Sequence, residues 1–323
     1  MKYKIFFLVF IFLIIGSTFN VNAQPFEIFK GKLAPGRFIP SKSADEYHLQ
    51  AESYFEAGNY PKALLCYLLI IHHFKNNVHC SSALKQVAFC YVRLGKPDLA
   101  DRYLSQYVEI NEGSANFQDV CHLKYMIAQS YAKGTKKHLY GLEGLPRLEN
   151  AQDDALRIYN EIISSFPAEE VAAKSLFGKA VLLMIQKKYD DSIKIFQMLI
   201  RQFPESSLSP DSFVNISKIY LIQSLSEPQN SKYLSSAANN LIRMKELYPG
   251  VVQKIAAASL NLQKIRENSA EGLYRLGRFY EKKRKILSAR IYYKNAVNTF
   301  PETLAAGKCR ERIDAHTGLI FAS

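Results

Sequence analysis

The sequence predicts an all-α chain that repeats one helical hairpin about six times. Small and aromatic residues recur at helical spacing over most of the chain, with Gly or Pro at the intervening turns. Only 15 Gly and 12 Pro occur in 323 residues, too few for the many turns of a β protein. The 48% of apolar side chains is typical of a globular protein, which excludes disordered, collagen-like and polytopic membrane chains.

The first 23 residues predict a signal peptide. Lys2 and Lys4 precede eleven unbroken apolar residues, and Val21-Asn22-Ala23 offers a small-residue cleavage site. We expect cleavage after Ala23, with retention as a membrane anchor as the alternative. Bacterial lipoproteins carry their acylated cysteine immediately after this site, and here Gln24 occupies it. We therefore expect a mature, exported chain without a lipid anchor.

Residues 24–43 predict an extended N-terminal arm, because three Pro and two Gly interrupt them. The rest of the chain, 44–323, is expected to form one repeat domain. No run of 18 consecutive apolar residues occurs in it, so we expect it to be soluble.

The first two repeats define the pattern. In each, the first helix carries a small residue and an aromatic residue and ends at Gly. The second helix of the first repeat begins with Pro61 in its first turn. The same pattern returns 37 residues later. Corresponding positions are Ala51 and Ala88, Tyr54 and Tyr91, Gly58 and Gly95, Ala63 and Ala100, and Tyr67 and Leu104.

Four further copies follow, and four second helices end in an aromatic residue before proline. Proline disfavours helical geometry in the residue before it, so each pair predicts a helix end. The pairs are Phe166-Pro167, Phe203-Pro204, Tyr248-Pro249 and Phe300-Pro301. Small residues on both helices predict close packing within each hairpin. On first helices they are Ala51, Ala88, Ala128, Ala180 and Gly277, and on second helices Ala63, Ala100, Ala155 and Ala289.

The repeats are interrupted in three places. About 15 residues are inserted at 133–150 and about eight around 227–230, by comparison with the first repeat. Residues 251–266 have helical periodicity, and we expect them to form one long helix with the first helix of the last hairpin. The predicted repeats are 44–76, 78–110, 119–167, 171–204, 210–249 and 251–312.

This pattern resembles tetratricopeptide repeats, and the resemblance implies a right-handed α-solenoid superhelix of about six helical hairpins. The order of features is similar to that of the BamD group of outer membrane protein assembly factors. Those features are an exported chain, an early arm, a loop in the third repeat at 133–150, and a long helix before the last hairpin. Proteins of that group are usually lipoproteins with five repeats. This chain departs from both, with Gln24 at the acceptor position and an additional repeat at 168–204.

The resemblance implies a non-catalytic periplasmic scaffold that associates with the outer membrane through its partners. Those partners are a BamA-like assembly protein and nascent outer membrane proteins. Tetratricopeptide arrays hold partners on the concave face lined by the first helices. Transferring the groove positions gives Asp45, His48, Glu52, Phe55 and Glu56, then Ser82, Lys85, Phe89, Val92 and Arg93. The alternative for Phe55 and Phe89 is a place in the core.

No motif in the sequence indicates catalysis, so we expect no enzyme activity, no cofactor and no metal. His72, His73, His79 and Cys80 are the densest set of metal-ligand types, but their spacing matches no zinc motif. The cysteines number five, an odd count that excludes a fully paired disulfide framework. Cys66, Cys90 and Cys121 fall on apolar faces as core thiols, and a Cys66–Cys90 disulfide in an oxidising compartment is the alternative.

The chain carries a net charge of +13, and none of the functions predicted above accounts for it. Two basic clusters stand out, at 136–138 and 282–285. Each is either a solvated turn or a contact for anionic lipid headgroups or an acidic partner, and export makes nucleic acid an unexpected partner.

Two other functions are considered for the chain. One is a periplasmic adaptor for Tol-associated or cell-wall machinery, although no heptads precede residue 44. The other is a helical lytic transglycosylase, but helices predicted as far as residue 312 leave no room for its catalytic domain.

Overall fold

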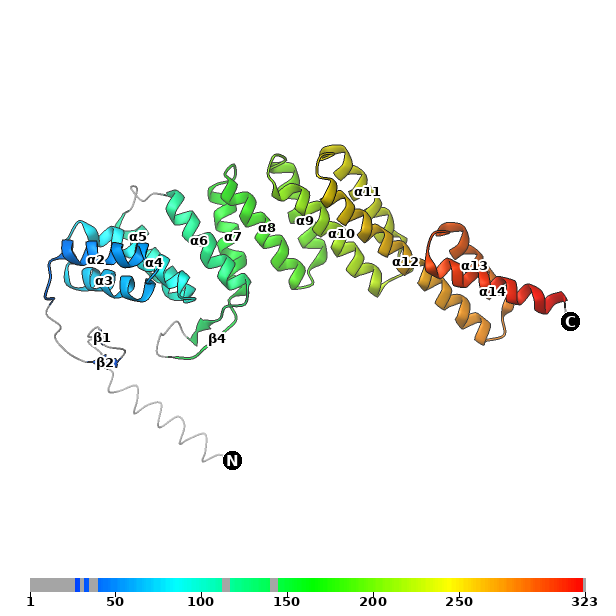
Figure 1. Cartoon of the computed structure of the whole chain (residues 1–323), viewed down its shortest axis with the longest axis horizontal. Helices are drawn as coiled ribbons and strands as arrows, with labels where there is room; N and C mark the ends of the chain where they lie inside the picture. The colour runs from blue at the N-terminus through cyan, green and yellow to red at the C-terminus, as the bar shows by residue number, and fades with distance from the viewer. Residues whose placement is uncertain (1–26, 30–31, 35–39, 112–116, 140–144, 322–323) are drawn as a thin grey trace, which may run out of the picture. The chain divides into compact units, whose positions relative to one another are not determined.

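The computed structural model describes residues 27–29, 32–34, 40–111, 117–139 and 145–321 (Figure 1). The predicted signal peptide and most of the predicted arm lie outside them. The chain divides into two compact units, 1–83 and 84–323. In the described part, no helix combines the length and the apolar character needed to cross a membrane.

The first unit contains one helical hairpin. Helix α2 (Ala44–Glu56) packs on α3 (Tyr60–His73), and α4 (His79–Arg93) begins in this unit. Gly58 joins α2 to α3 with a φ of 71°, a left-handed value that favours glycine. Before them, β1 (Glu27–Phe29) pairs antiparallel with β2 (Lys32–Ala34). The sequence predicts only extended chain there and does not reveal the pairing.

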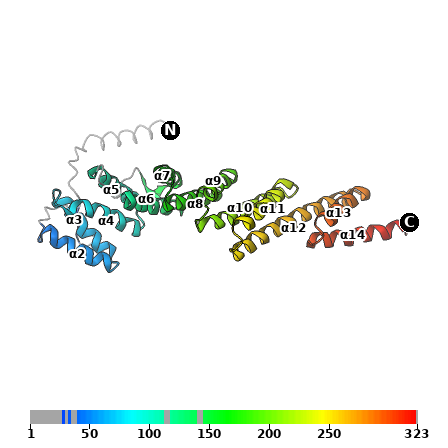
Figure 2. The same cartoon turned by 90° about the horizontal axis from the view of Figure 1, so that it is seen from above.

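The second unit is a row of helices, each packed on the next (Figures 1 and 2). The first helix of a pair also packs on the first helix of the following pair, as in α6 with α8, α8 with α10 and α10 with α12. Because each hairpin packs on the next one through its first helix, the fold is an α-solenoid. Its helices are α5 (Pro97–Ile110), α6 (Phe117–Ala132), α7 (Gln152–Ser165), α8 (Glu170–Ile185), α9 (Tyr189–Gln202), α10 (Leu208–Ser226), α11 (Ser231–Leu247), α12 (Val252–Lys282), α13 (Ile286–Thr299) and α14 (Leu304–Phe321).

The predicted small residues lie where helices meet. Every alanine of the predicted set is fully buried, and Gly277 is buried as well. A Cβ added at Gly277 would lie 2.2 Å from Cε1 of Tyr293, whose ring is fully buried on α13. The absence of a side chain at Gly277 therefore allows the Tyr293 ring to lie against the α12 backbone.

The aromatic residue of each aromatic-proline pair ends its helix, as predicted. Phe166, Phe203, Tyr248 and Phe300 are the C-caps of α7, α9, α11 and α13, each outside helical geometry with φ between −128° and −135°. Phe74 ends α3 with similar angles although no proline follows it. A following proline is thus not necessary for a helix to end in this way.

The predicted long helix is confirmed, since α12 runs for 31 residues without a break. Its first half lies along α10, and two asparagine side chains of α12 donate hydrogen bonds to serine hydroxyls of α10. Asn261 Nδ2 is 2.9 Å from Ser217 Oγ, and Asn268 Nδ2 is 3.1 Å from Ser224 Oγ. The spacing is seven residues on both helices, so the contacts repeat every two turns. The extra residues predicted around 227–230 mostly lengthen α10 and α11, which have 19 and 17 residues.

The insertion at 133–150 contains β3 (Lys137–His138), which pairs antiparallel with β4 (Arg147–Glu149). His138 is buried, and its ring and backbone nitrogens both contact the carboxylate of Asp98 on α5. Arg147 Nε donates to His138 Nε2 at 3.2 Å, which requires the Nδ1–H tautomer, and Arg147 Nη1 donates to the Gly95 carbonyl at 2.6 Å. This network holds the insertion against α5.

Neither predicted alternative for 136–138, a solvated turn or a contact for anionic headgroups or an acidic partner, fits His138, which is buried. His138 is paired with Asp98, and Lys137 Nζ lies 2.5 Å from the Asp154 carboxylate. Burial raises the pKa of the Asp98 carboxyl, but the side-chain and backbone hydrogen bonds from His138 outweigh burial and leave that pKa below its usual range. The Asp98 carboxylate then stabilises the fold above its unfolded pKa, and this stabilisation is lost as pH falls through the lowered folded pKa.

Gly277→Ala and Gly307→Ala should have opposite effects on stability. At Gly277 the new methyl group collides with the buried Tyr293 ring, so the free energy of unfolding should fall by about 1–3 kcal/mol. Gly307 lies in α14 with open space around it, so alanine should raise that free energy by about 0.5–1 kcal/mol through helix propensity. Urea unfolding followed by circular dichroism measures both. Equal effects at the two sites would contradict the packing described here.

Asp98→Asn should destabilise the chain because it removes the charge that His138 contacts in a buried site. A hydrogen bond to a charged group contributes about 1.5–3 kcal/mol, and the neutral amide accepts the hydrogen bonds of His138 more weakly. The control is Asp153→Asn, since Asp153 is exposed on α7 and should change stability by less than about 0.5 kcal/mol. Thermal unfolding at pH 7 compares the two variants, and similar melting temperatures would refute the role of Asp98.

Candidate functional site

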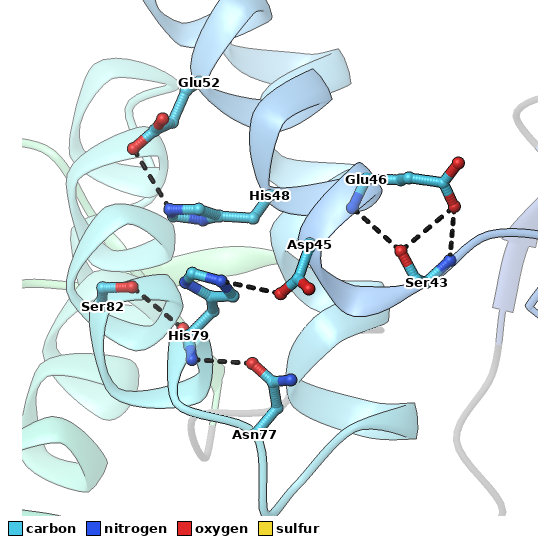
Figure 3. Close-up of polar contacts among 8 residues, drawn as sticks. All are labelled: Ser43, Asp45, Glu46, His48, Glu52, Asn77, His79 and Ser82. Atoms are coloured by element: carbon cyan, nitrogen blue, oxygen red, sulfur yellow. Dashed lines mark hydrogen bonds and ion pairs between the residues drawn. The ribbon is translucent and has the colours of Figure 1, made fainter.

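Helix α2 begins with a complete capping box (Figure 3). The backbone N–H of Glu46 donates to Ser43 Oγ at 3.2 Å, and the backbone N–H of Ser43 donates to the Glu46 carboxylate at 2.8 Å. The backbone N–H and the hydroxyl of Ser43 both donate to the Glu46 carboxylate, and these two bonds lower the pKa of that carboxyl because they favour its charged form. The cap fixes the first turn of α2 and hence the directions of the side chains that follow.

His79 is held at the start of α4 by two short-range hydrogen bonds. Its backbone N–H donates to Asn77 Oδ1 at 2.8 Å, and Ser82 Oγ donates to its carbonyl at 3.0 Å. An Asx cap of this kind satisfies an N–H group that has no partner inside the helix. The imidazole of His79 consequently points toward α2 (Figure 3).

Two histidine rings stack between α2 and the start of α4. The rings of His48 and His79 lie 4.0 Å apart between centroids, at an interplanar angle of 17°. Each faces a carboxylate of α2, because His79 Nε2 is 3.0 Å from Asp45 Oδ1 and His48 Nε2 is 3.2 Å from Glu52 Oε1. The predicted residues Asp45, His48 and Glu52 therefore come together around a histidine that the groove prediction did not include.

The outer side of α2 carries an acidic stripe, defined by Asp45, Leu49, Glu52 and Glu56. These positions follow one another by four, three and four residues, so they share one helix face, and all four are exposed. Leu49 keeps 67% of its surface exposed in the middle of the stripe. Helix α2 contains four acidic residues and neither Lys nor Arg, so its charge is −4 within a basic chain.

The other predicted groove residues have separate surroundings. The Phe55 ring packs edge-on against Tyr60, with 5.7 Å between centroids. In the second unit, Lys85 Nζ lies 2.7 Å from the Asp119 carboxylate, and the Arg93 guanidinium lies 5.0 Å from the centroid of Phe89. Phe55, Phe89 and Val92 are half-buried, between the core and the groove alternatives. A binding role for these residues stays a prediction.

Sequence reasoning missed Leu49 and Asn77 and placed His79 in a different set. Helical spacing places Leu49 on the same face as Glu56, seven residues later. Nothing in the sequence indicates that this leucine is exposed. In the described part of the chain, no group of three or more His, Cys, Asp or Glu residues is placed to hold a metal ion. His72 and His73 are exposed at the end of α3.

All five cysteines are free and buried, so the predicted alternative of a Cys66–Cys90 disulfide is not formed. Burial raises the pKa of the Cys90 thiol to about 12 and those of Cys121 and Cys309 to about 11. These thiols stay protonated at neutral pH and fill the core as small apolar groups.

Comparison with known proteins identifies two repeats. A tetratricopeptide repeat model matches residues 174–206, which cover most of α8 and α9, and another matches 270–303, which cover the end of α12 and α13. No curated protein is significantly similar to the chain. Neither matched model describes a catalytic family.

Solved tetratricopeptide structures are similar at low identity. The C-terminal part of a TPR repeat-containing protein from Cytophaga hutchinsonii is 14% identical and has a TM-score of 0.42, covering 81% of this chain and 98% of that chain. A tetratricopeptide repeat protein from Parabacteroides merdae is 11% identical, with a TM-score of 0.40 and coverage of 84% and 97%. Because these scores are below 0.5, the fold assignment rests on the helix pairs and the repeat matches. By those two observations, the chain is an α-solenoid of helical hairpins that contains tetratricopeptide repeats at 174–206 and 270–303.

Proposed function

We propose that this chain is a non-catalytic scaffold in outer membrane protein assembly, which binds a basic segment of a partner through the acidic stripe of α2. The stripe is the observation that carries the proposal. Its three carboxylates and one leucine form an exposed row on a capped helix. Such a row is complementary to an amphipathic segment with Lys or Arg around an apolar side chain.

The histidine pair supports the stripe. His79 contacts Asp45 and His48 contacts Glu52, so two of the three carboxylates are oriented before any partner arrives. A preorganised side chain loses less conformational entropy on binding than a free one. The partner we propose is a BamA-like assembly protein, with unfolded outer membrane protein segments as further ligands.

The setting of this scaffold is also a proposal, and the order of its parts supports it. The sequence begins with a signal-like segment, the insertion at 133–150 interrupts the third hairpin, and α12 precedes the last one. This order resembles that of the BamD group. We therefore propose a periplasmic location, at the outer membrane, reached through protein partners.

Charge reversal of the stripe should abolish partner capture. In Asp45→Lys/Glu52→Lys, two attractive contacts become repulsive, so affinity for the partner should fall at least about tenfold. The control is Asp190→Lys/Asp191→Lys, which reverses two exposed carboxylates in the first turn of α9 and changes the net charge equally. Tagged variants are compared by pull-down from envelope extracts, with circular dichroism to verify folding.

Recovery of a BamA-like β-barrel protein by the wild type and the control, but not by the stripe variant, supports the proposal. Recovery of that protein by all three chains would refute the stripe as the binding surface. Recovery of cell-wall enzymes or Tol components in place of the barrel protein would refute the assembly function and favour an adaptor for those systems.

A further inference from the structure

The positive charge of the chain is concentrated in one short segment of the last hairpin. Residues 275–294 contain eight Lys or Arg and one acidic residue, Glu281, a net charge of 8 − 1 = +7. The whole chain carries +13, so these 20 residues hold more than half of the excess. The segment comprises the end of α12, the turn after it and the first part of α13.

Most of this charge is not neutralised within the described residues. Glu281 is already engaged, because Arg278, Arg312 and the Tyr293 hydroxyl all contact its carboxylate. Arg275 pairs with Glu271. The remaining six basic residues make no ion pair in the part of the chain that the structure describes: Lys282, Lys283, Arg284, Lys285, Arg290 and Lys294. The first four of them form the basic turn, and all four are exposed.

Large apolar side chains flank the basic turn. Phe279 precedes it with 53% of its surface exposed, and Leu287 and Ile291 follow it with 76% and 67% exposed. Leu287 and Ile291 are four residues apart, so they lie on one face of α13. Lys283 lies 5.9 Å from the centroid of the Phe279 ring, which keeps an ammonium group beside an exposed apolar surface.

The basic turn places Arg284 in a backbone conformation that favours glycine. Arg284 has a φ of 57°, in the region where the corresponding turns use Gly58, Gly95 and Gly134. A side chain in this region strains the backbone, and glycine would remove the strain. Lys187 accepts the same strain in the turn between α8 and α9, so the geometry is not unique to the basic turn.

We propose that the end of the last hairpin binds the surface of an anionic lipid bilayer. Basic side chains at the rim of exposed Phe, Leu and Ile side chains match a bilayer, where headgroup phosphates surround an apolar interior. Two cavities of the second unit lie away from this turn, one lined by residues of α5, α6 and α7 and one by residues of α8 and the turn after α9. Exposed apolar side chains beside a cluster of basic ones are the combination that interfacial membrane binding uses.

The test is co-sedimentation of the full chain with phosphatidylcholine vesicles that contain or lack about 30% phosphatidylglycerol, at low salt and at about 0.5 M NaCl. The tip variant is Lys282→Gln/Lys283→Gln/Arg284→Asn/Lys285→Gln. The matched control removes four exposed charges elsewhere, as Lys187→Asn/Lys188→Gln/Lys194→Gln/Arg201→Gln. Residues 1–23 are the same in every chain, so a difference between the variants cannot come from them.

We expect the wild type and the control to bind anionic vesicles strongly at low salt, and the tip variant to bind at least about 100-fold more weakly. Leu287→Ser/Ile291→Ser should lose the binding that persists at high salt, because that part depends on apolar insertion. Absence of salt-sensitive binding to anionic vesicles, or equal loss in the tip variant and the control, would overturn the proposal. Capture of an acidic protein by the basic turn, without vesicle binding, would assign this surface to a protein partner.

Discussion

The close approach of two helices at a small side chain is the contact on which the whole solenoid depends. At each such position the alanine is fully buried, so its partner helix lies directly against it. Gly277 is the extreme case, because the Tyr293 ring occupies the space where a Cβ would be. Close contact within a hairpin determines where its aromatic side chains reach the next hairpin, and that contact repeats from α5 to α14.

The repeat architecture could be predicted because its signals are local. A small residue, an aromatic residue and a turn residue recur within about 35 positions, and proline ends a helix through its immediate neighbour. The role of His138 could not be predicted in this way. Its partner Asp98 is 40 residues earlier, and only the fold brings the two together. The same holds for His48 and His79, whose stacking depends on the turn between α3 and α4.

The candidate binding residues were predicted in part, for a related reason. Transferring family positions identified Asp45, His48 and Glu52, because helix periodicity alone places them near one another. It did not distinguish Phe55 and Phe89 from core residues, since half-burial depends on the neighbouring helix. The charge of the chain is similarly misleading as a total. The net charge of +13 includes −4 on α2 and +7 in residues 275–294. These two surfaces suit ligands of opposite charge.

The unbroken length of α12 has a consequence for how this chain tolerates insertions and deletions. The other hairpins are joined by turns, and a turn absorbs an added or lost residue by local rearrangement. In α12, one residue corresponds to a rotation of about 100° and a rise of about 1.5 Å. A single deletion between Asn268 and Gly277 would keep the Asn–Ser contacts with α10 but turn α13 and α14 to another side. The number of residues in α12 between its contacts with α10 and with α13 thus determines the direction in which the last hairpin points.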